Sequence, residues 1–282
     1  TYDAGWEPLR RARFARQREL GMRDDRYVFP EAAEEVPAWE DFADQKDWIR
    51  KMQVYAAMVE EMDKGIGRLV VELAATGQLD NTLILFLSDN GGCAETVGGR
   101  KLNKPGSTIG GKGSYVAYGP PGAFLSNVPF RKYKKWVDEG GIATPLIAHW
   151  PAGMGLDARG EWRDDVGHVI DLLPTALDAA GLPGKKAFPG RSLLPSFPGQ
   201  PPADDRVLYW EHFGQQAVRS GPWKLSRNIP EAPWRLFNLA EDPTEVLDVA
   251  DRQPELIDSL DEAFTEWAHD IGVKGFLDGD DR

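Results

Sequence analysis

Apolar side chains early in the chain recur with the period of a helix. Between Asp47 and Ala75 they return every three or four residues, which places them on one face of an α-helix. The members of this face are Trp48, Met52, Tyr55, Val59, Met62, Ile66, Leu69, Val70 and Leu73. An arginine-rich stretch from Glu7 to Leu20 predicts an earlier surface helix, with Asp3 as its candidate N-cap.

Two apolar runs without alternation predict strands at 82–87 and 146–150. Continuous runs of this kind are typical of strands buried on both faces of a sheet. A further helix is expected over 165–179, interrupted near Pro174. The order helix, strand, long Gly-rich loop, strand, helix favours an α/β sheet.

The pattern changes after about Pro189, where short β-prone runs alternate with Gly and Pro turns. The runs predict a small antiparallel meander and lie at 207–210, 215–219, 223–226 and 234–237. An amphipathic helix is expected from Glu255 to His269, with Pro254 in its first turn. We therefore divide the chain into an α/β part, 1–190, and a small α+β part, 191–282.

Composition narrows the possible partners. The 282 residues carry a formal net charge of −12, which disfavours a nucleic-acid partner. No apolar run approaches the length of a membrane span. The one cysteine, Cys93, lacks a neighbouring base and is expected to be a bystander thiol. The chain starts at Thr1 without an initiator methionine, as the middle of a longer protein would, so a missing export signal says nothing about location.

The strand at 82–87 stops at Ser88-Asp89-Asn90-Gly91-Gly92. The carboxyl ends of strands are where open α/β sheets place ligands, and Asp89 and Asn90 offer the oxygen atoms that calcium or magnesium prefers. The glycines allow a sharp turn and close approach. The same residues are also good turn chemistry, so the segment alone leaves both a cation site and a simple turn open.

A basic cluster precedes the second strand. Arg131, Lys132, Lys134 and Lys135 stand between aromatic residues, just before Gly140-Gly141. A lysine is a compact positive charge that suits a sulfate or phosphate oxyanion, although charge pattern alone also fits a solvated surface. A metal and a lysine together would neutralise a transferring anion. His212, which follows Tyr209-Trp210-Glu211, is a candidate for the border of a substrate cleft.

These motifs, in this order, resemble the sulfatases of the alkaline-phosphatase superfamily, in particular the arylsulfatases, over nearly the whole chain. The segments that carry the resemblance are 2–10, 88–92, 129–145, 167–175 and 209–225. The resemblance implies a partial alkaline-phosphatase-like mixed sheet flanked by helices, followed by a small C-terminal antiparallel sheet with a terminal helix. It also implies a periplasmic or extracellular sulfuric ester hydrolase acting on an aryl sulfate or a sulfated carbohydrate.

By the same resemblance, Asp89 and Asn90 would bind Ca²⁺, for which Mg²⁺ is the weaker candidate. Lys134 would bind the sulfate, because it lies five residues before Glu139-Gly140-Gly141; Lys132 and Lys135 fit this spacing less well. The family's nucleophile is a formylglycine made from a cysteine or serine. Its motif, Cys/Ser-x-Pro/Ala-x-Arg, is absent from this sequence.

The missing motif indicates a truncated sulfatase whose nucleophile lies upstream of Thr1. We expect such a fragment to be inactive, and to be poorly soluble because strand 82–87 would lack a neighbour. Two alternatives stay open: a phosphomonoester or phosphonate hydrolase of the same superfamily, and a non-catalytic module that binds sulfated glycans. Many phosphatase relatives have a histidine after the Asp-Asn pair, so Gly91 in this position favours a sulfatase.

Overall fold

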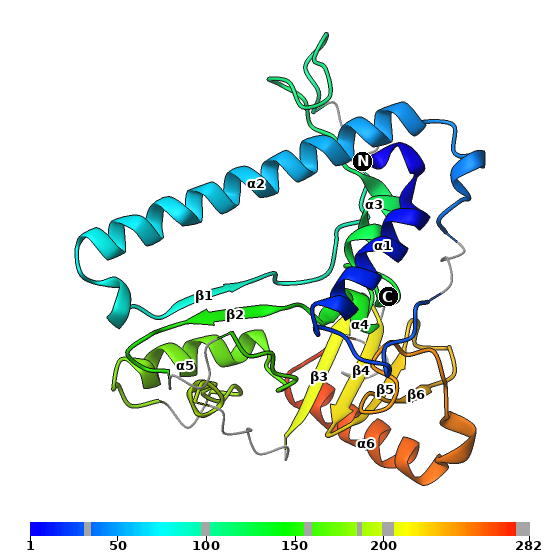
Figure 1. Ribbon diagram of the computed structural model, residues 1–282. Coiled ribbons are helices and arrows are strands. Elements are labelled where there is room, and N and C mark those ends of the chain that lie inside the picture. Colours follow the sequence, from blue (N-terminus) through cyan, green and yellow to red (C-terminus); the bar gives the residue numbers. More distant parts are fainter. Residues whose placement is uncertain (31–34, 97–101, 155–159, 185–187, 199–205, 275–282) are drawn as a thin grey trace. The chain divides into compact units, whose positions relative to one another are not determined.

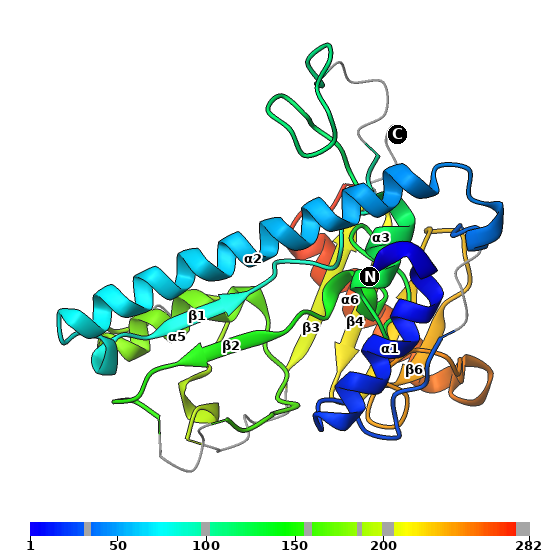
Figure 2. The same ribbon diagram turned by 45° about the horizontal axis from the view of Figure 1, so that its top comes forward.

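The structure is a computed structural model, and it describes residues 1–30, 35–96, 102–154, 160–184, 188–198 and 206–274. The chain forms two compact units. Unit 1 comprises Thr1–Ala56, Asn90–Ala143 and Asp205–Arg282, and unit 2 comprises Ala57–Asp89 and Thr144–Asp204. Figures 1 and 2 show the elements of both units in two views.

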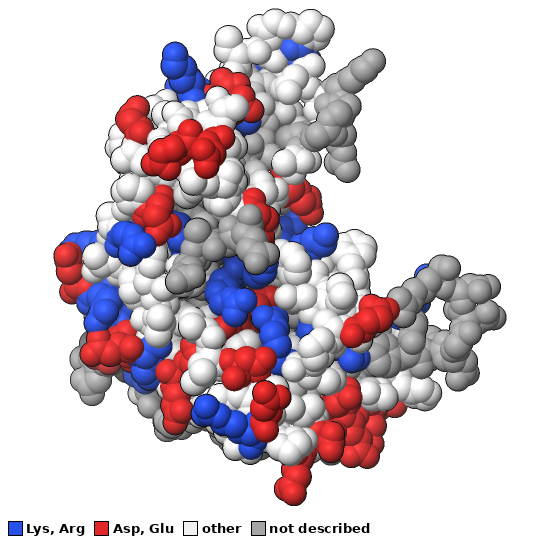
Figure 3. All heavy atoms as spheres, turned by 90° about the vertical axis from the view of Figure 1, so that its right-hand side faces the viewer, with Lys and Arg blue, Asp and Glu red and all other residues white. Residues whose placement is uncertain are grey.

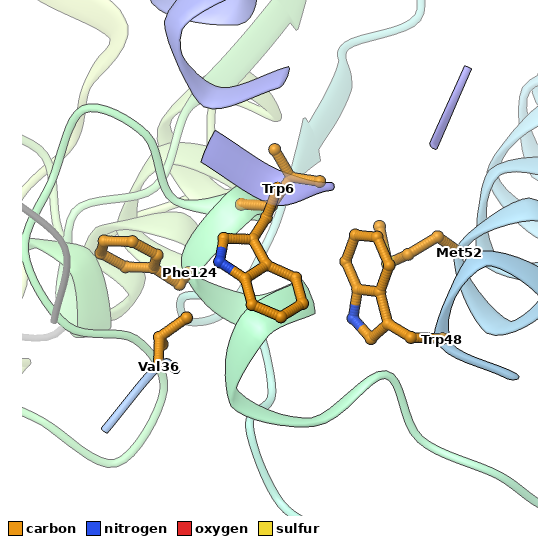
Figure 4. Packing of buried hydrophobic residues seen from close by; sticks show 6 residues of the cluster. Trp6, Val36, Trp48, Met52 and Phe124 are labelled. Atoms are coloured by element: carbon orange, nitrogen blue, oxygen red, sulfur yellow. The ribbon is translucent and has the colours of Figure 1, made fainter. Parts of the chain in front are cut away.

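The N-terminal helices of unit 1 pack around tryptophans. Helix α1 (Trp6–Glu19) follows a 3-10 turn at Tyr2–Ala4, and α3 spans Gly119–Ser126. Figure 4 shows the Trp6 indole between Phe124 and Trp48. The buried members of this core are Trp6, Val36, Trp48, Met52, Phe124 and Leu125.

The predicted N-cap of α1 is wrong. The cap is Gly5, whose φ of 80° suits glycine and whose missing Cβ leaves room for the Trp39 ring. Asp3 lies within the preceding 3-10 turn. The arrangement of the aromatic core therefore decides where this helix starts.

The long helix is confirmed as α2 (Gln45–Ala75). Its first turns bury Trp48 and Met52 in the core of unit 1. In unit 2, its apolar face is partly open: Val59, Met62 and Leu69 are 42%, 48% and 66% exposed.

The C-terminal meander and its terminal helix are confirmed. Strands β3 (Val207–His212), β4 (Gln215–Ser220), β5 (Trp223–Arg227) and β6 (Arg235–Asn238) form an antiparallel sheet in sequence order. Helix α6 (Pro254–Asp270) packs on β4 and β5. The buried residues of this second core are Val218, Leu225, Leu236, Leu260, Phe264 and Ala268.

In unit 2, β1 (Ile84–Leu87) pairs antiparallel with β2 (Leu146–His149), with Ile84 opposite His149. The strands exist as predicted, but the prediction that they are buried is wrong for this structure. Phe86 is 39% exposed and Ile147 is 60% exposed, because in the described part of the chain the two strands pair only with each other.

Helix α5 (Leu172–Ala179) is shorter than predicted. A 3-10 turn at Val169–Asp171 precedes it, and a capping box fixes this turn: the Asp171 carboxylate accepts from the His168 amide at 2.8 Å. Pro174 thus falls in the first turn of the helix, where a missing amide hydrogen costs little.

Among the described residues, the further elements are α4 (Glu139–Ile142) and 3-10 turns at Trp39–Asp41, Leu79–Asn81, Leu194–Ser196 and Ala250–Arg252. Within the part of the chain that the structure describes, no helix is long and apolar enough to cross a membrane. On the face drawn in Figure 3, basic and acidic side chains are interspersed.

Candidate active site

The turn after β1 is built on close backbone contacts. The Gly91 amide donates to the Gly141 carbonyl at 3.0 Å, and the Gly92 amide donates to Asn127 Oδ1 at 2.8 Å. A Cβ at Gly91 would overlap the Gly140 carbonyl, so no other residue fits there without a backbone shift. Asp89 is exposed and Asn90 half-buried at the start of this turn.

The lysine segment lies against this turn within unit 1. The Lys134 amide donates to the Gly92 carbonyl at 3.0 Å, which brings the backbone of the predicted sulfate lysine next to the turn that begins at Asn90. This hydrogen bond therefore joins the turn after β1 to the lysine segment, which lies more than forty positions later in the sequence.

The backbone on both sides of Lys134 is strained. Lys132 and Lys135 have φ of 61° and 95°, a region that residues with a Cβ rarely adopt. Such strain persists only where surrounding contacts hold it, and it is common at functional sites.

The lysines of this segment differ in their partners. Lys132 Nζ pairs with Glu35 at 2.8 Å and lies over the Trp136 ring. Lys134 Nζ is 3.9 Å from the exposed Glu95 carboxylate, a weak pair across solvent. The Lys134 ammonium is thus less engaged than that of Lys132, which favours Lys134 as the group that meets an external anion.

Asn127, at the end of α3, is the central polar residue of this site, and the sequence reasoning missed it. Its side chain accepts from Gly92 and donates to the carbonyls of Lys132 at 3.0 Å and Gly140 at 2.8 Å. One amide thus joins the turn, the lysine segment and α4. No short motif signals these contacts, because their partners lie 5 to 35 residues away.

Helix α4 is held from its other side by buried charges. Lys224 Nζ, from β5, is 2.7 Å from Glu139 Oε1 and 2.8 Å from Glu245 Oε1. Arg235, from β6, pairs with Asp138 at 3.2 Å. Burial alone would lower the pKa of Lys224, but the Glu139 and Glu245 carboxylates outweigh it and raise that pKa. Burial raises the pKa of Glu245 to about 7, against the opposing effect of Lys224.

The donor set fits part of a calcium shell. Asp89 and Asn90 are adjacent oxygen donors on a turn that glycine keeps open. Among the described residues, however, no group of three or more His, Cys, Asp or Glu side chains could hold a metal ion. A calcium ion bound by this turn would need further ligands from elsewhere.

His212 and Cys93 have local surroundings. His212 is the exposed last residue of β3, with its ring 4.5 Å from that of Phe213 and its backbone paired with Gln215. These contacts belong to the β3–β4 hairpin, so a cleft role for His212 stays a prediction. The Cys93 amide donates to the Tyr118 hydroxyl at 3.2 Å, which ties the end of the turn to α3.

Two family models match the chain. The sulfatase model covers residues 23–182, and the model of the C-terminal part of N-sulphoglucosamine sulphohydrolase covers residues 130–269. An uncharacterized sulfatase of Schizosaccharomyces pombe is 30% identical over 96% of this chain and 53% of its own length. An arylsulfatase of Klebsiella aerogenes is 34% identical over 69% of this chain and 43% of its own length. The chain thus spans about half the length of these relatives.

Solved structures show the same fold. The crystal structure of Ps i-CgsB matches 93% of this chain and 54% of its own, with a TM-score of 0.61 and 25% identity. A phosphonate monoester hydrolase of Agrobacterium radiobacter matches 77% of this chain and 40% of its own, with a TM-score of 0.50 and 19% identity. The predicted partial alkaline-phosphatase-like fold with its C-terminal sheet and helix is confirmed. The family models and the relatives together show that this chain belongs to the sulfatase family.

Proposed function

We propose that the protein containing this chain is a sulfuric ester hydrolase of the arylsulfatase type. The observation that carries the proposal is the hydrogen bond from the Lys134 amide to the Gly92 carbonyl. It joins a turn that bears oxygen donors to a lysine segment, and these are the two groups that an anionic ester requires. Family membership supports the same activity.

In this proposal, Asp89 and Asn90 supply part of the shell of a Ca²⁺ ion, which when bound would neutralise a sulfate oxygen. Lys134 places a second positive charge on the sulfate and stabilises the charge that develops on the leaving oxygen. The nucleophile is a formylglycine outside this chain, since the sequence lacks the motif from which one is made. The chain alone is therefore expected not to hydrolyse aryl sulfates.

Paired lysine variants of the full-length protein test this role. Removing one oxyanion-stabilising group typically lowers turnover by about 100-fold or more, so Lys134→Met should lower kcat/KM for an aryl sulfate by that amount. Lys135→Met is the matched control. Lys135 is the residue after Lys134, and its exposed side chain carries the same charge. Equal losses in the two variants would contradict a specific role for Lys134.

Metal dependence has its own test. Chelation should abolish turnover, and Ca²⁺ should restore it better than Mg²⁺. Asp89→Asn and Asn90→Ala should each raise the Ca²⁺ concentration needed for half-maximal activity. Activity that is unchanged after exhaustive chelation would exclude the calcium role.

The alternative is a phosphate or phosphonate ester hydrolase, which the fold likeness to the phosphonate monoester hydrolase keeps in view. Sulfate and phosphate esters share tetrahedral geometry and negative charge, so the turn and the lysine suit both. Parallel assays of aryl sulfate, aryl phosphate and aryl phosphonate with the full-length protein separate the two. Binding of a sulfated glycan without any turnover would instead favour the non-catalytic module.

A further inference from the structure

A buried ion cluster connects the C-terminal sheet to the candidate site. We propose that Lys224 is a positioning residue, which sets the lysine segment through Glu139 and α4 without touching substrate. We call Lys224, Glu139 and Glu245 the Lys224 cluster. The inference rests on the proposed role of Lys134.

The Lys224 cluster holds the first residue of α4 at two points. Lys224 and Glu245 are fully buried, and Lys224 Nζ pairs with both carboxylates at 2.7 and 2.8 Å. Glu245 Oε2 also accepts from the backbone amide of Glu139 at 2.6 Å. The side chain and the backbone of Glu139 are thus fixed by groups from β5 and from the loop after β6.

Glu245 is itself fixed in an unusual conformation. Its φ is 56°, which is unfavourable for a residue with a Cβ. Its carbonyl accepts from Arg131 Nη1 at 2.6 Å, so the residue that holds α4 also contacts the start of the lysine segment. Strain of this kind is retained where several contacts over-determine the geometry.

Two glycines connect Glu139 to the site. The Gly140 carbonyl accepts from Asn127, and the Gly141 carbonyl accepts from the Gly91 amide. A Cβ at Gly140 would overlap the Arg131 carbonyl, and one at Gly141 would overlap the Trp136 carbonyl. Because α4 lies in direct backbone contact on both sides of Lys134, a displacement of Glu139 must displace the lysine segment or open a gap.

Stability alone is a weak reason for such a cluster. Taking charges out of water costs several kcal/mol per ion, so a buried ion pair is seldom more stabilising than apolar side chains of the same volume. What charges supply and apolar side chains do not is directional bonding. Here those bonds end on α4, next to the backbone that carries Lys134.

A double-mutant cycle in the full-length protein tests the inference. Lys134→Met, Lys224→Met and the double variant are compared by kcat and KM for an aryl sulfate. If Lys224 acts through the lysine segment, Lys224→Met should lower kcat/KM by about 10-fold or more, with the same kcat-to-KM pattern as Lys134→Met. The double variant should then be no slower than Lys134→Met, because the two residues act as one unit.

Arg227→Met is the matched control. It also removes a cation from β5, but Arg227 bonds Gln216 Oε1 at 2.6 Å and stacks on Trp234, away from α4. It should keep nearly wild-type kcat/KM when assayed well below its melting temperature.

Lys224→Met leaves two carboxylates without their cation and risks misfolding. The triple variant K224M/E139Q/E245L carries no charge in the cluster and should fold, yet it should still lose turnover because the directional bonds are gone. Wild-type turnover in a folded triple variant would overturn the inference, as would multiplicative losses in the cycle. A Lys134→Met variant with unchanged turnover would overturn the proposed function as well, so the two failures are distinguishable.

Discussion

At the scale of single residues, Asn127 is the side chain on which the site's backbone depends. Replacing it by alanine removes three hydrogen bonds, each worth about 1 kcal/mol net. We expect Asn127→Ala to lower the unfolding free energy of the full-length protein by about 2–4 kcal/mol, as measured by urea denaturation.

Two further variants sharpen this test. Asn127→Asp keeps the acceptor for Gly92 but directs a carboxylate oxygen at two carbonyls, so it should be at least as destabilising as alanine. The neighbouring Ser126→Ala removes one bond to Gly122 inside α3 and should cost about 1 kcal/mol or less. Equal effects of Asn127→Ala and Ser126→Ala would argue against the joining role of Asn127.

Glu245 predicts a pH dependence of stability. Burial raises its pKa in the folded protein from 4.5 to about 7, so the folded state holds a proton that the unfolded state releases. Its contribution to stability is present below about pH 4.5 and is lost as the pH rises through about 7.

Glu245→Gln mimics the protonated side chain and should remove this loss. The melting temperature of the wild-type full-length protein should therefore fall more between about pH 5 and about pH 8, a range that covers most of this window, than that of Glu245→Gln. Glu241→Gln, an exposed carboxylate in the same loop, should leave the wild-type slope unchanged. Parallel wild-type and Glu245→Gln curves would contradict the raised pKa.

The residue types of the candidate site were readable from sequence only where they form a contiguous motif. Asp89 and Asn90 stand beside Gly91-Gly92, and Lys134 lies at a fixed spacing before Gly140-Gly141. Both glycine pairs make close backbone contacts in the structure. Their chemical roles stay predictions. Asn127, Lys224 and Glu245 could not be found in this way, since each acts on partners that are distant in sequence.

At the scale of elements, the short helix α4 has no room for a side chain at either of its two glycines. Gly141→Ala would place a Cβ on the Trp136 carbonyl, a backbone atom that cannot rotate away. We expect this variant to lose turnover and to unfold at a lower temperature.

Gly67→Ala in α2 is the matched control. It should raise the free energy of unfolding by about 0.5–1 kcal/mol, since its Cβ meets nothing and alanine favours a helix. A neutral Gly141→Ala would show that α4 can shift without consequence.

Elements that depend on local pattern were predictable. The apolar period of α2 and the alternation of turns and short β-prone runs in β3–β6 are local sequence patterns. The N-terminal boundary of α1 depends on Gly5, which packs against the Trp39 ring, and that of α5 depends on the capping box of Asp171. Apolar periodicity reveals neither contact. The burial of β1 and β2 depends on neighbours, and sequence says nothing of which neighbours are present.

At the scale of the whole molecule, apolar side chains are buried unevenly between the two units. Both buried hydrophobic clusters that the structure describes belong to unit 1. In unit 2, large apolar side chains from a helix and a strand stay open to solvent, among them Leu69, Val71 and Ile147, which are 66%, 69% and 60% exposed. Exposed apolar surface beside an unpaired strand edge promotes association.

This imbalance predicts how the chain behaves alone and within a protein as long as its relatives. Expressed alone, the 282-residue chain should aggregate, as seen by light scattering after size exclusion. Leu69→Lys and Ile147→Lys should each reduce that aggregation. In the full-length protein, where we expect further chain to cover these side chains, the same variants should lower the melting temperature because they would bury a charge. Ile271→Lys, in an exposed position of unit 1, should change neither property. A monodisperse wild-type chain with a sharp cooperative melt would contradict the expectation, and it would mean that unit 2 needs no covering partner.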